Sequence, residues 1–374
     1  MARARTTNGF AQLLDTARVI VCCGSGGVGK TTTAAAMAVE ASRRGRRVVL
    51  VTIDPAKRLA DALGLDHLGN EPSEVRLADG GTIWATMLDA RATFDDVIRR
   101  NARDESQVRA ILSNPFYENV ASRLSGSQEY MAAEKLYELH SDERFDLVVV
   151  DTPPTREALD FLDAPQRLMN FLDHRVYRWM VAPTRGGLKL LNFAAQPVLR
   201  TIGRVIGADV LADAIEFFRA FDGIEAGFRA RAESVRALLR SGDTRYVVVT
   251  SARSDAVAEA GYFADTLSAS RLSIAGLVVN RLQPQFGSGT AAAAQNEADR
   301  AEAEGRNDDA VLWRNLSHLK RIAEAETATV KPLLAKIAPA PVARVSQRPT
   351  DVHDLDAVNL IAADLVTPAD GTTR

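Results

Sequence analysis

The ten residues GSGGVGKTTT, which run from Gly24 to Thr33, constrain the fold of this chain more than any other stretch. They match the pattern G-x-x-x-x-G-K-[ST] of a phosphate-binding loop. The apolar run RVIVCC comes directly before them, and the helical pattern TTTAAAMAVEASRR follows. A strand, a glycine-rich turn and a helix in this order are the context that such a loop needs. The sequence therefore predicts a phosphate site rather than a ligand-free glycine turn.

The residues of this loop have different tasks. Glycines let backbone N–H groups close on phosphate oxygens without side-chain interference, and the following helix turns its positive end toward them. Lys30 would reach the β- and γ-phosphates, and the Thr31 hydroxyl would hold Mg²⁺. The loop residues predicted to bind the nucleotide are Gly24, Ser25, Gly26, Gly27, Val28, Gly29, Lys30, Thr31 and Thr32.

Short apolar runs alternate with helical patterns along most of the chain. The runs RRVVLVTID, TIWATMLD, FDLVVVD, RYVVVTSA, AGLVVNRL and PVARVS have the length of buried parallel strands. The alternation predicts an α/β fold with a doubly wound, mostly parallel sheet and an inserted all-helical subdomain. The expected boundaries are a core at about 17–90, 143–158, 243–290 and 337–366, a helical subdomain at about 91–142 and 159–242, and additional polar helices at about 291–336.

Two aspartates end apolar strands and are expected near the loop. Ligands of open α/β sheets bind beyond the carboxyl ends of the strands, where both side chains would face the phosphates. Asp151 follows DLVVV, and we predict that it holds Mg²⁺ through water. Asp54 follows VVLVTI and precedes the helical pattern KRLADAL, so its position suits either a catalytic group or a helix cap.

Composition argues against several other classes of protein. The formal net charge is −2, so no excess of positive charge favours nucleic acid or an acidic membrane surface. No run approaches the ~18 apolar residues of a membrane span, and the N-terminus lacks the apolar segment of a signal peptide. Cys22 and Cys23 are adjacent in a strand, which suits buried thiols in a reducing compartment. We expect a cytoplasmic protein with no integral membrane segment and no nucleic-acid partner.

Four motifs, in order, resemble those of one ATPase family. GSGGVGKTT, TIDPAKRLADAL, VVVDTPPTREALDFL and GLVVNR are similar to motifs of the ATPases that drive arsenical pumps or target tail-anchored membrane proteins. The segments LDARATFDDVI and LSGSQEYMAAEKLYEL look most like a bacterial branch called anion-transporting ATPases. The resemblance covers the chain from about Val19 to the last helix and implies a P-loop ATPase that uses ATP and Mg²⁺.

The resemblance also implies roles for matching residues. Asp54, in the first switch segment, would position the attacking water, so Asp54 and Lys30 are the predicted catalytic residues. Residues 151–155 would form the second switch segment, and Thr31 and Asp151 would hold the metal. Asn280, at the end of GLVVN, would contact adenine, with help from residues at about 346–350.

Ser25 departs from the family loop, which reads GKGGVGKTT. In the family this lysine reaches across a dimer to the partner's phosphates and stabilises charge in the transition state. A homodimer of this chain would lack that cation. Either the chain forms a heterodimer with a paralogous subunit that keeps the lysine, which we favour, or another cation such as Lys57 or Arg58 replaces it in a homodimer.

A second departure concerns zinc. The eukaryotic targeting factors clamp their dimer with C-x-x-C pairs after the VVN strand, where this chain has QPQFGSGTAAAAQNEADRAEAEG. Structural zinc needs about four nitrogen or sulfur ligands, so we predict that the chain binds no zinc. The histidines are scattered singly, at His67, His140, His174, His318 and His353.

Apolar residues of the inserted helices allow two interpretations. They can form the core of the helical subdomain, or they can line a groove for an apolar helical client, as in the targeting members of the family. The insert has no cysteine, so arsenite binding is not expected. The residues concerned are Leu168, Met169, Leu172, Val176, Tyr177, Trp179 and Met180, and then Leu211, Ile215, Phe218, Phe221, Ile224, Phe228, Val235 and Leu238.

These features predict a Mg²⁺-dependent ATPase whose nucleotide-driven dimer changes control the binding of a client or partner through the helical subdomain. One alternative is a regulatory subunit that binds ATP but hydrolyses it weakly because of Ser25. Another is a partitioning-type ATPase, which the acidic last helix DVHDLDAVNLIAADL disfavours as a binder of DNA or membrane.

Overall fold

A single sheet organises the chain. The computed structural model describes residues 9–54, 58–117, 127–153, 160–173, 208–352 and 354–367. Within these residues eight strands lie in the order β3-β4-β2-β5-β1-β6-β7-β8, and every pair is parallel except β3 with β4. This confirms the predicted doubly wound, mostly parallel α/β fold. The strands are β1 (Val19–Cys23), β2 (Val48–Thr52), β3 (Ser73–Arg76), β4 (Thr82–Met87), β5 (Leu147–Asp151), β6 (Thr244–Ser251), β7 (Ile274–Leu282) and β8 (Val342–Ser346).

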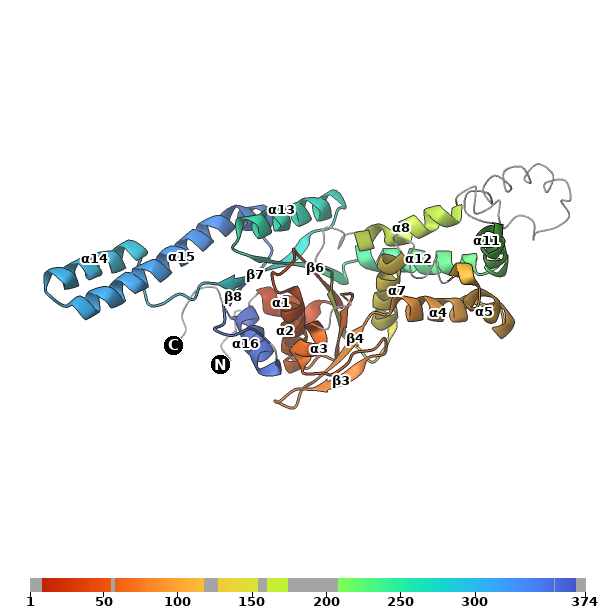
Figure 1. Cartoon of the computed structure of the whole chain (residues 1–374), viewed down its shortest axis with the longest axis horizontal. Helices are drawn as coiled ribbons and strands as arrows, with labels where there is room; N and C mark the ends of the chain where they lie inside the picture. Colours follow the sequence, from red (N-terminus) through yellow and green to blue (C-terminus); the bar gives the residue numbers. More distant parts are fainter. Residues whose placement is uncertain are drawn as a thin grey trace, which may run out of the picture.

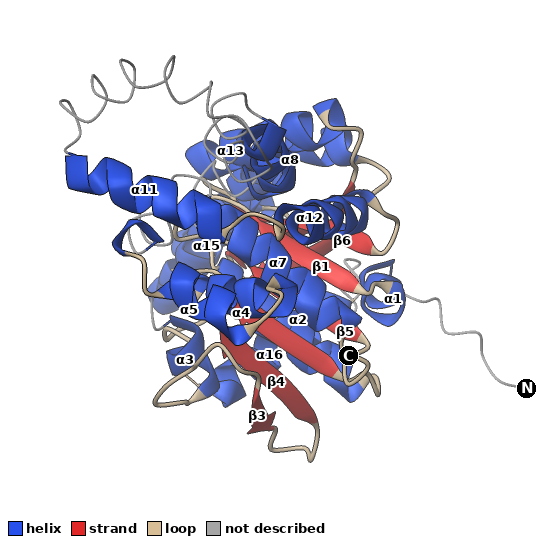
Figure 2. Ribbon diagram, turned by 90° about the vertical axis from the view of Figure 1, so that its right-hand side faces the viewer, coloured by secondary structure: helices blue, strands red, loops and turns tan. Residues whose placement is uncertain are grey.

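Helices cover both faces of the sheet (Figure 2). One face packs against α1, α2, α3 and α16, and the other against α7, α8, α12, α13 and the end of α15. The described helices are α1 (Gly9–Thr16), α2 (Lys30–Arg43), α3 (Arg58–Leu63), α4 (Ala90–Asn101), α5 (Glu105–Leu112), α7 (Ser127–Ser141), α8 (Asp160–Asp173), α11 (Ala208–Ala220), α12 (Glu225–Arg240), α13 (Ser254–Ala269), α14 (Ala291–Ala303), α15 (Asn307–Ile337) and α16 (Leu355–Val366).

Burial on both faces explains why the central strands read as continuous apolar runs. All five residues of β1 are buried, and the strand lies between β5 and β6. Because side chains alternate along a strand, Cys22 packs into one core and Cys23 into the other. Burial raises the pKa of the Cys23 thiol to about 12, so it stays protonated and unreactive at neutral pH.

The inserted helices have a core of their own. This third cluster joins residues of α4, α5, α7, α8, α11 and α12 and is rich in aromatic rings. Met169, Leu172, Phe218 and Phe228 are buried in it. Val235 and Leu238, farther along α12, pack instead against the sheet. The apolar residues of the insert that the structure describes therefore mostly form core, whereas residues 174–207 lie outside the described ranges.

A helical hairpin projects from the opposite end of the molecule (Figure 1). It consists of α14 and α15, in the segment where the sequence predicts additional polar helices. The sequence analysis missed the short edge strand β3 and the helices α1 and α13. None of the described helices is long and apolar enough to cross a membrane.

Candidate functional site

The phosphate-binding loop connects β1 to α2, and two of its glycines are required by close contacts. Gly24 has φ 152°, and a Cβ there would lie 2.2 Å from the carbonyl oxygen of Val249 on β6. Gly29 has φ 89°, and a Cβ there would lie 2.3 Å from Nδ2 of Asn280 on β7. Only glycine combines these conformations with such close approach, which holds the loop against the ends of two strands.

Lys30 begins α2, and its ammonium group folds back over the loop. Its Nζ donates a hydrogen bond of 2.8 Å to the carbonyl oxygen of Ser25. Burial lowers the pKa of Lys30, while the nearby Asp151 carboxylate opposes that effect. A buried ammonium that donates to a loop carbonyl is poised to bind an anion at the same loop.

Asp151 lies at the carboxyl end of β5, beneath the loop. Its Oδ2 accepts hydrogen bonds from Oγ1 of Thr31 at 2.7 Å and from Oγ1 of Thr52 at 3.1 Å. Its Oδ1 is buried and has no hydrogen-bond partner among the described residues. Burial raises the pKa of Asp151 to about 6, although the two hydroxyl donors favour the ionised form. The carboxyl group is thus costly to ionise until a cation joins it.

These oxygens fit Mg²⁺. The ion prefers oxygen ligands and retains several waters, so it needs only one or two protein groups beside the phosphates. Thr31 and Asp151 supply a hydroxyl and a carboxylate that are already in contact. The buried Oδ1 of Asp151, which has no hydrogen-bond partner among the described residues, would gain a favourable interaction with a bound cation. No group of three or more His, Cys, Asp or Glu residues suited to a metal occurs among the residues described. The absence of zinc stays a prediction.

Asp54 lies just beyond β2, and its backbone N–H donates to Oγ1 of Thr52 at 3.2 Å. The side chain lines the same cavity as Lys30 and Thr31. The guanidinium of Arg58 lies 3.7 Å from Oδ2 of Asp54, on a side chain that is 64% exposed. Lys57, the other predicted substitute cation, lies outside the described residues.

Asn280 ties the end of β7 to the loop. Its Nδ2 donates to the carbonyl oxygen of Val28 at 2.9 Å, and its Oδ1 accepts from the backbone N–H of Arg281 at 2.9 Å. Arg281 has φ 57°, a conformation that is strained for a residue with a side chain. Asn280 therefore holds loop and strand together, and its contact with adenine stays a prediction.

The predicted residues gather around one cavity of about 560 Å³. Of the predicted site residues, it brings together Gly27, Gly29, Lys30, Thr31, Thr32, Asp54 and Asn280. Residues of the segment 346–352 also line this cavity. The segment follows β8 and includes the range 346–350 that was expected near adenine. Ser25, Gly26 and Val28 line a second cavity of about 580 Å³, which shares Gly27 with the first. Gly24, the first residue of the loop, and Asp151, beneath it, are both buried.

Sequence reasoning did not name Thr52, and it gave Thr152 and Arg348 only as members of the predicted ranges 151–155 and 346–350. Thr52 is the second donor to Asp151, and its position as the last residue of a strand that ends beside the loop could have indicated this. Thr152 donates to the carbonyl oxygen of Cys22 at 2.6 Å and also lines the cavity. Arg348 reaches the cavity from the other end of the chain, where its guanidinium contacts Asp364 at 2.6 Å. Arg348 falls in the range 346–350 that was expected near the nucleotide, but the sequence assigned it no individual role.

The parallel sheet, the glycine-rich loop at a helix N-terminus and the carboxylate at a neighbouring strand end define a nucleotide-binding protein of the P-loop class. The chain belongs to the anion-transporting ATPase family, because the model of that family matches residues 17–301. This confirms the resemblance that the motifs indicated.

The relatives of this chain include three ATPases of fungi. The chain is 32% identical to ATPase GET3 of Malassezia globosa over 149 residues, which are 40% of this chain and 43% of that protein. It is 31% identical to ATPase get3 of Aspergillus terreus over 152 residues, 40% of this chain and 44% of the relative. With ATPase GET3 of Rhodotorula glutinis the identity is 26% over 270 residues, 72% of this chain and 71% of the relative. The chain thus spans less than half of the length of the first two relatives.

Proposed function

We propose that this chain hydrolyses ATP with Mg²⁺ and that its nucleotide state controls the pairing of subunits and the binding of a partner through the helical subdomain. The observation that carries the proposal is the contact between Thr31 and Asp151 beneath the cavity, with the buried Oδ1 of Asp151 unpartnered among the described residues. Family membership supports it.

Each residue would do a limited task in this reaction. The loop amides and Lys30 would bind the phosphates, with Lys30 exchanging the Ser25 carbonyl for a phosphate oxygen. Thr31 and Asp151 would hold Mg²⁺, which neutralises charge on the phosphates when it is bound. Asp54, at the cavity wall, would accept a hydrogen bond from the attacking water and orient it toward the phosphate.

The connection of α7 to β5 supports transmission from the nucleotide to the helical subdomain. Five residues separate α7 from β5, the strand that ends at Asp151. Glu134 of α7 is buried and accepts a hydrogen bond of 2.6 Å from Arg231 of α12. Glu138 of α7 pairs with Arg100 of α4 at 2.8 Å. A displacement of Asp151 would therefore move a helix that is tied to two others of the subdomain.

Two kinds of partner subunit are compatible with the site, a lysine-bearing paralogue and a second copy of this chain. Ser25 lacks the charge of the family lysine, which supports pairing with a lysine-bearing paralogue and weak hydrolysis by the isolated chain. Arg58 beside Asp54 supports the alternative, in which a homodimer completes its site with a cation of the same chain. A client would contact apolar surface exposed only after the subdomain changes shape, because its described apolar residues are largely buried.

The test of the proposed chemistry is Asp54→Asn. Asparagine keeps the shape of the side chain and removes its charge, so ATP binding should be retained while turnover falls about 100-fold or more. Binding of a fluorescent ATP analogue and release of phosphate are measured on the same preparations. Asp66→Asn, an exposed aspartate outside the cavity, is the matched control and should leave both unchanged. Unchanged turnover in Asp54→Asn would remove Asp54 from the mechanism.

A further inference from the structure

Within the described ranges, two residues other than glycine have a positive φ, and both are arginines. They are Arg271, at φ 60°, and Arg281, at φ 57°. Arg271 follows the end of α13, where a residue in the left-handed conformation commonly ends a helix. Arg281 lies inside the strand β7, where no helix end accounts for this conformation. The strained backbone of Arg281 therefore needs a different explanation.

A β-bulge near the end of β7 contains Arg281. Three steps along β7, from Val279 to Leu282, match two steps along β8. A bulge of this kind can have a left-handed residue, and it redirects a side chain next to a functional site. Glycine would adopt the conformation without strain, so an arginine at this position indicates that its side chain has a use.

The residues on either side of Arg281 hold the bulge in place. Oδ1 of Asn280 accepts a hydrogen bond from the backbone N–H of Arg281 at 2.9 Å, and Nδ2 of Asn280 donates to the phosphate-binding loop. The carbonyl oxygen of Leu282 accepts a hydrogen bond from the backbone N–H of Gln347 at 2.8 Å. The backbone of Arg281 is therefore fixed relative to the loop and to the segment after β8, whereas its side chain is exposed.

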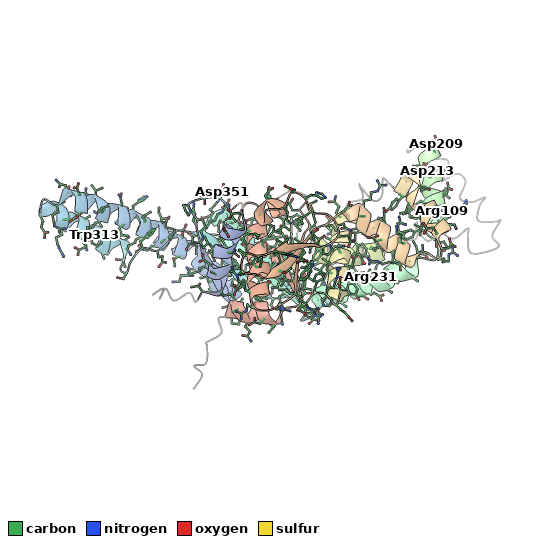
Figure 3. The ribbon with its side chains drawn as sticks, turned by 90° about the horizontal axis from the view of Figure 1, so that it is seen from below. Arg109, Asp209, Asp213, Arg231, Trp313 and Asp351 are labelled. Carbon is green, nitrogen blue, oxygen red and sulfur yellow. The ribbon has the colours of Figure 1, made fainter. Side chains whose placement is uncertain are left out.

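The side chain of Arg281 lines both cavities that adjoin the phosphate-binding loop. Gly27 of the loop and Gln347 also line both cavities. Figure 3 shows Asp351, another residue of the first cavity, far along the molecule from Trp313 on the hairpin. The end of the hairpin that carries Trp313 therefore does not cover this cavity. Arg281 lies beside the loop that would hold phosphates and is accessible from the cavity.

Arg281 differs from the other described arginines of these cavities, because each of those lies beside an aspartate. The pairs are Arg58 with Asp54 at 3.7 Å, Arg253 with Asp255 at 2.7 Å and Arg348 with Asp364 at 2.6 Å. Arg281 forms no ion pair with a residue of the described ranges. A guanidinium without a carboxylate partner, beside a phosphate-binding loop, suits an anionic ligand. Its planar group of N–H donors matches two oxygens of one phosphate.

We propose that Arg281 binds the phosphate chain of the nucleotide held by the loop of the same chain. This role rests on the proposed function, because ATP is taken as the ligand of the first cavity. Lys30 would reach the phosphates from the start of α2, whereas Arg281 would approach them from the end of β7. Two N–H groups of the guanidinium would donate to phosphate oxygens. Arg281 would add affinity for the nucleotide and take part in no step of hydrolysis.

Arg281→Gly tests the side chain without disturbing the backbone. Glycine accepts a positive φ without strain, which offsets its greater freedom in the unfolded chain, so the unfolding temperature should not fall. The affinity for ATP should fall at least tenfold, as measured by displacement of a fluorescent ATP analogue from the full chain with Mg²⁺. Arg281→Lys keeps the charge but loses the planar group of donors, so it should retain part of the affinity.

The matched control is Arg271→Gly. It makes the same change at the other arginine with a positive φ, at a position that lines neither cavity. Its affinity for ATP should equal that of the wild type. Binding is measured instead of turnover, so the result does not depend on hydrolysis or on the group that stabilises its transition state.

Adenosine shows which part of the nucleotide Arg281 contacts. Because adenosine has no phosphate, its affinity should be the same for the wild type and for Arg281→Gly. Equal losses for adenosine and ATP would place Arg281 at the base or the ribose and overturn its assignment to the phosphates. Unchanged affinity for ATP in Arg281→Gly overturns the role of Arg281 and leaves the proposed function intact, whereas a wild type that binds no ATP overturns both.

Discussion

At the scale of single residues, Asp151 combines two opposing requirements. It must be an anion to hold a cation, yet it lies in a buried position that disfavours charge. Because burial raises the folded-state pKa of Asp151 to about 6, above the ordinary aspartate value of 3.8, the folded protein binds this proton more tightly than the unfolded chain. Stability contributed by the proton is present below the unfolded pKa and is lost as the pH rises from about 4 to about 6.

Asp151→Asn should therefore stabilise the ligand-free protein at neutral pH. Two pKa units correspond to at most about 3 kcal/mol, and the gain should disappear as the pH falls through 6 toward 4. Urea unfolding of wild type and variant at pH 7.5, 6 and 4.5, without Mg²⁺ or nucleotide, measures the difference. A difference that is constant with pH would show that the ionisation of Asp151 does not limit stability.

At the scale of elements, β1, the loop and α2 form a unit whose shape depends on Gly29 and the tip of β7. Alanine at position 29 would carry the cost of a positive φ, about 1–3 kcal/mol, and would also displace Asn280. Gly27 is the matched control, because it has φ 75° and nothing lies within 4 Å of a Cβ there.

Gly29→Ala should thus destabilise the protein more than Gly27→Ala does. The excess should fall when Asn280→Ala removes the obstructing amide, which a double-mutant cycle of thermal unfolding measures. If Gly29→Ala and Gly27→Ala destabilise the protein equally, and Asn280→Ala changes neither effect, the loop accommodates the new side chain without displacing Asn280 at the end of β7.

Among the elements, some strands could be predicted from the sequence and others could not. The loop, β2, β5 and β7 were predictable because strands buried on both faces read as uninterrupted apolar runs. β3 was missed because it has four residues, of which only Val75 is buried. Thr52 was missed, and Arg348 was predicted only as part of the range 346–350, because their individual roles arise from contacts between distant segments. The exposure of Leu312 was equally hidden, since helical periodicity reports a face but not whether that face is covered.

At the scale of the whole molecule, turnover depends on which residue supplies the nucleotide site with a second cation beside Lys30. Ser25 lines the second cavity, whereas Asp54 lines the first. The backbone carbonyl oxygen of Ser25, not its side chain, accepts the hydrogen bond from Nζ of Lys30. A substitution at position 25 can therefore add a charge at the second cavity while leaving the contact between the loop and Lys30 in place.

Ser25→Lys should raise the ATP turnover of the isolated chain at least tenfold if the missing cation limits the reaction, since such a group contributes ~10³–10⁵ in related phosphoryl transfer. Ser25→Met supplies the length without the charge and should leave turnover at the wild-type rate. Steady-state phosphate release and sedimentation with nucleotide are measured together, because a cation that acts across subunits should make turnover rise with protein concentration. If the lysine adds little while Arg58→Ala abolishes turnover, the chain completes its site from within, and the need for a lysine-bearing partner disappears.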